Sequence, residues 1–149
     1  MKGLGKQSPE LSEGIQRKIA SIAEFAVKGR THIHRNGYSK EIDYIPEAEA
    51  ATRLAQQLAQ LAKGSALIRG RTEVEQEDLS LVQRVAFDCI PAARRRLLDT
   101  LMRDEKPEAS GLPSSSLSYI KEELQAVGLL TGEKLSEQAF ELLVEAGAL

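Results

Sequence analysis

The densest positive charge in the sequence is the run Arg94-Arg95-Arg96. A guanidinium holds several N–H donors in a fixed fork that fits either phosphate oxygens or a carboxylate. Three consecutive helical residues fan over roughly 200°, so at least one of them leans toward the protein interior. The run therefore predicts either a contact with a nucleic-acid backbone or an ion-pair seam to the acidic second half of the chain. We favour the seam.

A serine-rich segment beginning at residue 114 is the second candidate site. Its hydroxyls, with a tyrosine and a lysine, could contact phosphates and base edges. These candidates are Ser114, Ser115, Ser116, Ser118, Tyr119 and Lys121. Residues 105–149, however, hold three lysines against eight glutamates, a net charge of −5, whereas residues 1–104 carry +3. Because non-specific DNA affinity depends on neutralised phosphates, we expect weak DNA binding, and a protein-contact surface remains an alternative.

The histidines and the cysteine do not predict catalysis. His32 and His34 alternate along one extended segment, but no Cys or further His could complete a metal site, so an exposed strand face is favoured. Cys89 lies among apolar residues and predicts a buried thiol. The phosphate-cradling pattern G-x-x-x-x-G-K-[ST] is absent. The sequence thus predicts no catalytic residue, no metal and no cofactor held by this chain, which is not an enzyme by itself.

The composition is that of a soluble globular protein. Of the 149 residues, 42% are hydrophobic and 28% are charged. No apolar run approaches the roughly 20 residues needed to span a membrane, and the first residues lack the apolar block of a signal peptide. We therefore expect no membrane contact and a cytoplasmic location.

The first part of the chain predicts a helical bundle over residues 11–90 that carries a small hairpin near residues 31–45. Residues 1–10 are polar and predict a flexible lead-in. Apolar residues at steps of three and four predict one helix ending near Gly29 and another running from Pro46 to Gly70. Between these helices, Asn36-Gly37 predicts a two-residue hairpin turn.

A third helix is predicted to begin between Thr72 and Asp78 and to end before Pro91. Thr72-Glu-Val-Glu75 has the form of a capping box, although the acidic residues that follow also suit a later start. Proline cannot continue a helical hydrogen-bond ladder, so Pro91 marks the end.

Residues 91–149 predict a second unit. Leu97, Leu98 and Leu101 face inward on a short helix, a polar loop follows, and a helix with serine caps ends at Gly128. Two short extended pieces around Thr131-Gly132 and a last helix complete this part of the chain.

Two segments resemble known families. The alanine-rich helix that starts with Thr52-Arg53 and ends in Arg69-Gly-Arg71, followed by Val74 and Glu77-Asp78, resembles the helical lid of AAA+ ATPases, especially minichromosome-maintenance helicases and MoxR-like proteins. The segment from Arg94 onward, with its L-x-x-x-G-L-L at Leu124–Leu130, is similar to a winged-helix domain. Together they cover about residues 47–149, and the implied fold is mainly α: a lid-like bundle followed by a winged helix.

The resemblance implies a non-catalytic C-terminal module of a P-loop ATPase, coupling nucleotide state to DNA or to a protein partner. In such lids an arginine at the position of Arg53 reaches the γ-phosphate of nucleotide held by the core, so ATP and magnesium would be met only through a core absent from this chain. A solvated Arg53 paired with Glu49 is the simpler interpretation and is favoured.

The competing interpretation is a free-standing winged-helix transcriptional regulator that binds DNA and dimerises through its N-terminal bundle, which would make the chain a homo-oligomer. The partner would then be a second copy rather than an ATPase core.

Overall fold

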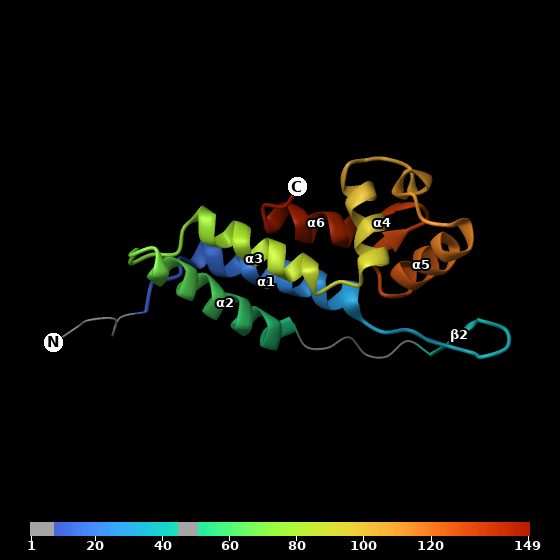
Figure 1. Ribbon diagram of the computed structural model, residues 1–149, viewed down its shortest axis with the longest axis horizontal. Coiled ribbons are helices and arrows are strands. Elements are labelled where there is room, and N and C mark those ends of the chain that lie inside the picture. Colours follow the sequence, from blue (N-terminus) through green and yellow to red (C-terminus); the bar gives the residue numbers. More distant parts are fainter. Residues whose placement is uncertain (1–7, 45–50) are drawn as a thin grey trace.

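Helices make up most of the protein, as the apolar spacing predicts. The computed structural model describes residues 8–44 and 51–149 (Figure 1). Its helices are α1 (Glu13–Arg30), α2 (Ala51–Ile68), α3 (Gln76–Asp88), α4 (Ala92–Met102), the 3₁₀ turn η1 (Pro107–Ser110), α5 (Ser114–Ala126) and α6 (Glu137–Glu145). Its strands are β1 (His34–Arg35), β2 (Ile42–Tyr44), β3 (Leu130–Thr131) and β4 (Lys134–Leu135). The predicted fold class, mainly α with a small hairpin, is confirmed at this level.

Helices α1, α2 and α3 pack side by side into the predicted bundle (Figure 1). The Ser12 side chain caps α1 by accepting a hydrogen bond from the Ile15 amide at 3.2 Å. The stripe predicted for α1 faces the core, where Ile19 and Ile22 are buried. The residues before α1 are tied down at Glu10, whose amide and carbonyl pair with the backbone of Thr72 and Val74. Residues 1–7, predicted to be flexible, lie outside the described residues.

The hairpin between α1 and α2 exists, but the predicted two-residue turn at Asn36-Gly37 is wrong. Strands β1 and β2 pair antiparallel, with His34 opposite Tyr44, and residues 37–40 form a longer loop. The Asn36 side chain accepts hydrogen bonds from the amides of Tyr38 and Ser39 at 2.8 and 3.1 Å, and these contacts draw the chain into a wider turn. Lys40, with φ of 63°, takes the left-handed conformation expected of Gly37.

The boundaries of α2 and α3 refine the predictions. Gly70 follows α2 with φ of 73°, as a helix terminator does. The predicted start of α2 at Pro46 lies outside the described residues. Of the two starts left open for α3, the later one is found: Glu75 is the N-cap, and its capping box is made with Asp78.

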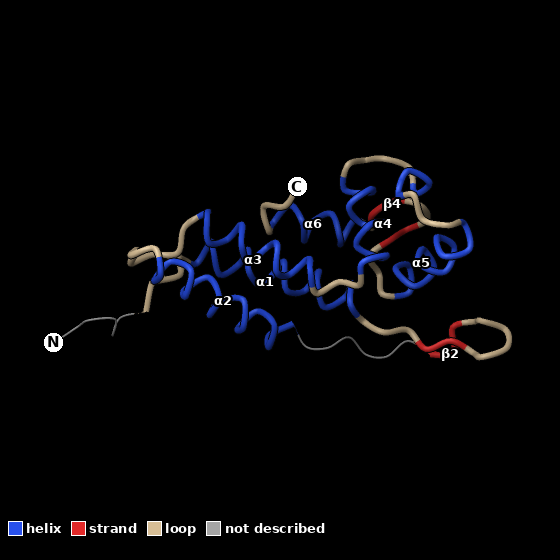
Figure 2. Tube along the Cα trace, in the orientation of Figure 1, coloured by secondary structure: helices blue, strands red, loops and turns tan. Residues whose placement is uncertain are grey.

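The second part contains helix α4, the turn η1, helix α5, the hairpin β3–β4 and helix α6 (Figure 2). Leu97, Leu98 and Leu101 are buried as predicted. The predicted serine caps on α5 are wrong, because Pro113 occupies the N-cap position and no side chain caps this end. The serines instead form the first turn, since the ring of Pro113 already fixes the extended backbone from which a helix can start. Gly128, with φ of 83°, ends the helical stretch as predicted.

The two parts are joined by helices that belong to both cores. The core of the α1–α3 bundle includes Ala146, at the end of α6. The second core, built mainly from α4, α5 and α6, includes Phe25 of α1. Helix α6 packs against α1, and the Gln83 side chain donates a hydrogen bond to the Ala146 carbonyl at 2.8 Å. Because of this sharing, neither core is closed without residues from the other part.

None of the described helices has the length and apolar content required to cross a bilayer. Cys89, predicted to be buried, is half-buried at the C-cap of α3.

Candidate functional site

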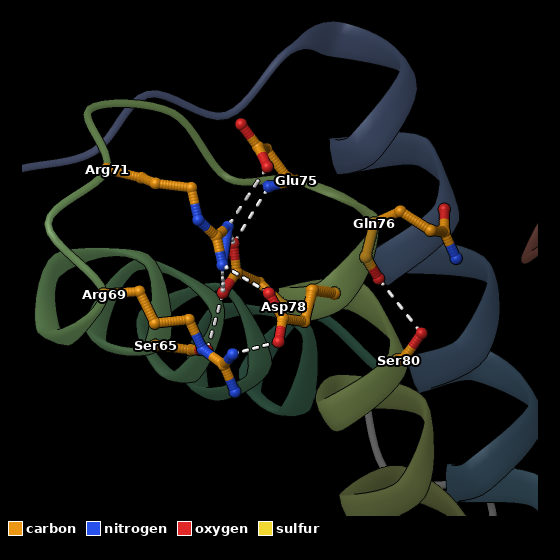
Figure 3. Close-up of polar contacts among 8 residues, drawn as sticks. Ser65, Arg69, Arg71, Glu75, Gln76, Asp78 and Ser80 are labelled. Carbon is orange, nitrogen blue, oxygen red and sulfur yellow. Dashed lines mark hydrogen bonds and ion pairs between the residues drawn. The ribbon is translucent and has the colours of Figure 1, made fainter.

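The corner between α2 and α3 is organised around a buried carboxylate (Figure 3). Asp78 is 0% exposed. One carboxylate oxygen accepts hydrogen bonds from the Ser65 hydroxyl at 2.6 Å and from the Arg71 guanidinium at 3.2 Å. The other accepts from Arg71 at 2.6 Å and from the Glu75 amide at 2.9 Å. Both oxygens are therefore satisfied, as a buried charge requires.

These contacts decide the charge state of Asp78. Burial by itself raises the pKa of the Asp78 carboxyl, but the hydrogen bonds from the Glu75 amide and the Ser65 hydroxyl, together with the positive charge of Arg71, lower this pKa by more than burial raises it. The net result is a pKa below the ordinary value for aspartate. Asp78 is therefore ionised at neutral pH, and its carboxylate pairs with the positively charged Arg71.

The two arginines of this corner, Arg69 and Arg71, both form ion pairs with carboxylates of the same chain. Arg69 pairs with Glu77, and Arg71 also reaches Glu75 and Glu77 at 3.5 and 3.2 Å. An anion site needs donors that point to solvent, and these donors already contact carboxylates. These ion pairs therefore link the end of α2 to the start of α3.

Arg53, the candidate nucleotide-sensing residue, lies in the first turn of α2 (Ala51–Ile68). Its side chain is exposed, while Leu54 beside it is buried in the bundle core. Glu49, its predicted ion-pair partner, lies outside the described residues. Arg53 therefore lies on the surface of the bundle, at a point where the buried side chain of Leu54 fixes the helix to the core.

The three consecutive arginines take three different positions. Arg94 is only 7% exposed and donates hydrogen bonds to the carbonyls of Gly29 and Thr31 at 3.0 and 2.7 Å. Its other guanidinium nitrogen lies 3.6 Å from the Glu123 carboxylate on α5. Arg94 therefore forms an ion-pair seam between α1, α4 and α5 and cannot reach a nucleic acid.

Arg95 and Arg96 are closer to solvent. Arg95 pairs with Asp88 and lies 3.7 Å from Asp99, with its guanidinium over the Phe87 ring. Arg96 is exposed. Of the run, Arg96 is the residue whose position leaves it open to an external phosphate.

The candidate residues on α5 do not form one surface. Ser114, Ser115 and Ser118 are exposed and Tyr119 is 42% exposed, whereas Ser116 is half-buried. Lys121 points toward the β3–β4 hairpin, where its ammonium lies 3.0 Å from the Glu133 carboxylate. The only basic residue of α5 is therefore already paired.

Arg35, on the distant hairpin, covers part of α5. Its guanidinium donates to the Tyr119 carbonyl at 3.0 Å and to the carboxylates of Glu122 and Glu123, each at 3.3 Å. It also lies 4.8 Å from the centroid of the Tyr119 ring. The α5 face that carries Tyr119 is thus a contact site for the β1–β2 hairpin of the same chain.

Sequence reasoning did not identify Arg35 and Asp78 as organising residues. The acidic residues after the predicted capping box at Thr72–Glu75 pointed to Asp78 only as a residue near a possible later helix start. Nothing local marks Arg35, since its partners are on α5, far along the chain. The only sequence signal for the contacts of Arg35 was the opposite net charge of the first and second parts of the chain, which favoured ion pairs between them.

Searches against family models, curated proteins and solved structures found no match for this chain. Within residues 8–44 and 51–149, no three His, Cys, Asp or Glu residues come together in the manner of a metal site.

Proposed function

We propose that this chain is a non-catalytic coupling module that works with a P-loop ATPase core. Its α1–α3 bundle would close over nucleotide held by the core, and residues 91–149 would engage the next component. The observation that carries the proposal is the sharing of α1 and α6 between the two cores. A displacement of the bundle must then move the second part with it, which is what a coupling element requires.

Arg53 is the residue through which the bundle would sense nucleotide. A guanidinium fork can stabilise the charge that develops on a transferred phosphoryl group. The side chain is exposed on a helix whose next residue, Leu54, is buried. The bundle can therefore present this charge to a separate core without rearranging its own packing.

A protein partner fits the second part better than DNA does. The order helix, 3₁₀ turn, helix, two-stranded hairpin and helix supports a winged-helix arrangement of residues 91–149. On the helix that would read DNA, however, Lys121 is paired with Glu133, and the face of Tyr119 is covered by Arg35. Glu122 and Glu123 on the same helix take up the charge of Arg35, so this cation is not free for a phosphate either.

ATP turnover tests the proposal directly. We expect no ATP hydrolysis by the purified chain, and we expect a P-loop core encoded in frame upstream or in a neighbouring gene. In the assembly of core and chain, Arg53→Ala should lower the turnover number at least about tenfold, with Arg53→Lys recovering part of the loss.

The matched control is Arg84→Ala, which removes an exposed arginine from α3. It should leave turnover unchanged. Hydrolysis that copurifies with the isolated chain would contradict the proposal, and an equal effect of both alanine variants would remove Arg53 from the sensing role.

The second candidate function is a DNA-binding regulator, favoured by the helix–turn–helix–hairpin order alone. We expect duplex DNA to bind more weakly than about 10 µM at about 150 mM salt, because few cations are free on α5. Fluorescence anisotropy with a labelled duplex, repeated over a salt series, measures this affinity. Tight, sequence-selective binding that survives moderate salt would instead support the regulator.

A further inference from the structure

A groove beside α6 has no role in the proposed function. It has a volume of about 1360 Å³ and lies between the end of α4, η1, β4 and α6. Apolar side chains line it, among them Met102, Pro107, Leu135, Phe140 and Leu149. Phe140 is 53% exposed and Leu149 is 45% exposed.

The apolar surface continues along the outside of α6. Val144 lies one turn after Phe140 on the same face and is 48% exposed. Single exposed apolar residues are ordinary on a protein surface. Phe140 and Val144, however, form a continuous apolar row on α6 that leads into the apolar groove. We call Phe140, Val144 and Leu149, together with the glutamates beside them, the α6 face.

The glutamates of the α6 face are Glu137, Glu141 and Glu145, spaced four residues apart. All three are exposed, no ion pair to another described residue involves them, and α6 contains no basic residue. Like charges at this spacing destabilise a helix, and negative charge near its C-terminus opposes the helix dipole. Glu137, in the first turn, suits the dipole, whereas Glu141 and Glu145 work against the stability of α6 itself.

The unpaired charges that line the groove outside α6 balance, so the net negative charge comes from the α6 glutamates. Asp104 and Glu108 line it without an ion pair among the described residues, as do Lys106 and Lys134. Glu105 and Glu133 also line it but are paired, with Arg103 and Lys121. Groove and α6 face thus combine five unpaired carboxylates with two unpaired lysines, a net charge of −3.

We propose that the α6 face and its groove bind a basic amphipathic segment of another protein. Bulky apolar residues of that segment would occupy the groove, and its lysines or arginines would pair with Glu137, Glu141 and Glu145. Helical segments are recognised in this way when apolar anchors three or four residues apart fit a groove. Nucleic acid and anionic membranes are disfavoured occupants because their phosphates would meet these carboxylates.

This inference rests on the proposed function in one respect, that the chain couples to a protein partner. It concerns a surface separate from Arg53. The ATP-turnover comparison and the binding experiment can therefore fail independently.

The test is fluorescence anisotropy with the full chain and three labelled 18-residue peptides. The probe carries leucines at helical steps of three and four with lysines on the other positions. The first control peptide replaces every lysine by glutamate, and the second replaces every leucine by alanine. We expect both controls to bind at least about tenfold more weakly than the probe, because charge and apolar anchors are both needed.

Variants place the binding on the α6 face. Glu141→Gln/Glu145→Gln should weaken the probe about fivefold and reduce its salt dependence, without weakening α6. Glu41→Gln/Glu73→Gln, which changes two exposed glutamates outside the helices, should change nothing. Phe140→Ser should weaken binding as well, whereas Ile68→Ser, which alters a residue 88% exposed on α2, should not.

Three results would overturn the proposal: equal binding of the charge-reversed peptide, equal binding of the alanine peptide, or equal loss in the control variants. Sedimentation equilibrium adds a fourth. If the chain dimerises and Phe140→Ser abolishes the dimer, the occupant of the α6 face is a second copy and not a basic partner.

Discussion

Asp78→Ala is expected to lower the free energy of unfolding by about 3 kcal/mol at neutral pH. The substitution removes the acceptor of the hydrogen bonds from the Ser65 hydroxyl, the Arg71 guanidinium and the Glu75 amide. It leaves the Ser65 hydroxyl without its partner in a buried position and the Arg71 guanidinium without its closest carboxylate. Breaking a buried pair costs more than the pair itself contributes, because the remaining group keeps its desolvation cost.

Urea unfolding followed by circular dichroism measures this loss. Asp88→Ala is the matched control, since it removes a carboxylate that pairs with Arg95 at a largely exposed position. We expect the control to cost less than about 1 kcal/mol. Equal losses in the two variants would show that the corner is not fixed by Asp78.

The same carboxylate gives stability a pH dependence with a defined sign. The pKa of Asp78 is lower in the folded chain than its ordinary value, so the folded state favours the ionised form. Its contribution is complete above the unfolded pKa of about 3.9 and is lost as the pH falls through that value and on through the lower folded pKa. Asp78→Asn should therefore flatten this part of the acid limb of the stability profile, whereas Asp88→Asn should leave it in place.

Phe25→Ala is expected to have the largest effect, a loss of about 4 kcal/mol of unfolding free energy. Phe25 is 0% exposed and extends from α1 into the second core. Its ring meets that of Phe87 edge to face, with centroids 5.8 Å apart. The alanine variant loses this contact and leaves a cavity at the point where α1 joins the two parts.

The position of this cavity leads us to expect a change in cooperativity as well. Hydrogen exchange should show α4, α5 and α6 becoming less protected than α1–α3, because the second core loses its contribution from α1. Phe140→Ala provides the comparison, because it removes a ring on α6 that is 53% exposed. A loss below about 1.5 kcal/mol, with protection lowered evenly over the chain, would argue against α1 as the link.

The local pattern of the sequence was enough to predict most of the helices. Apolar spacing placed Ile19 and Ile22 on the buried side of α1, and Leu97 and Leu98 on that of α4. Gly70 and Gly128 predicted helix ends because glycine readily adopts the positive φ angle of a terminating residue. Both glycines have positive φ angles in the structure. These features depend on neighbours within a few residues, so sequence alone could specify them.

Where a local pattern was compatible with several conformations, the prediction failed or stayed open. Asn36-Gly37 can close a two-residue turn, but the Asn36 side chain bonds to two amides and widens it. Ser114 can cap a helix, but Pro113 has already taken that position. In both places a single neighbouring group decided between alternatives of similar energy.

The sequence by itself determined the helical content, which face of each helix is apolar, and the opposite charges of the two parts of the chain. Only the tertiary structure decided which charges meet: Arg94 becomes a buried link, Arg35 covers α5, and Glu137, Glu141 and Glu145 pair with no residue in the described part of the chain. The physical reason is the range of the interactions. Backbone propensity and apolar periodicity act within a turn or two, whereas an ion pair depends on the distance between side chains that only the packed core brings together.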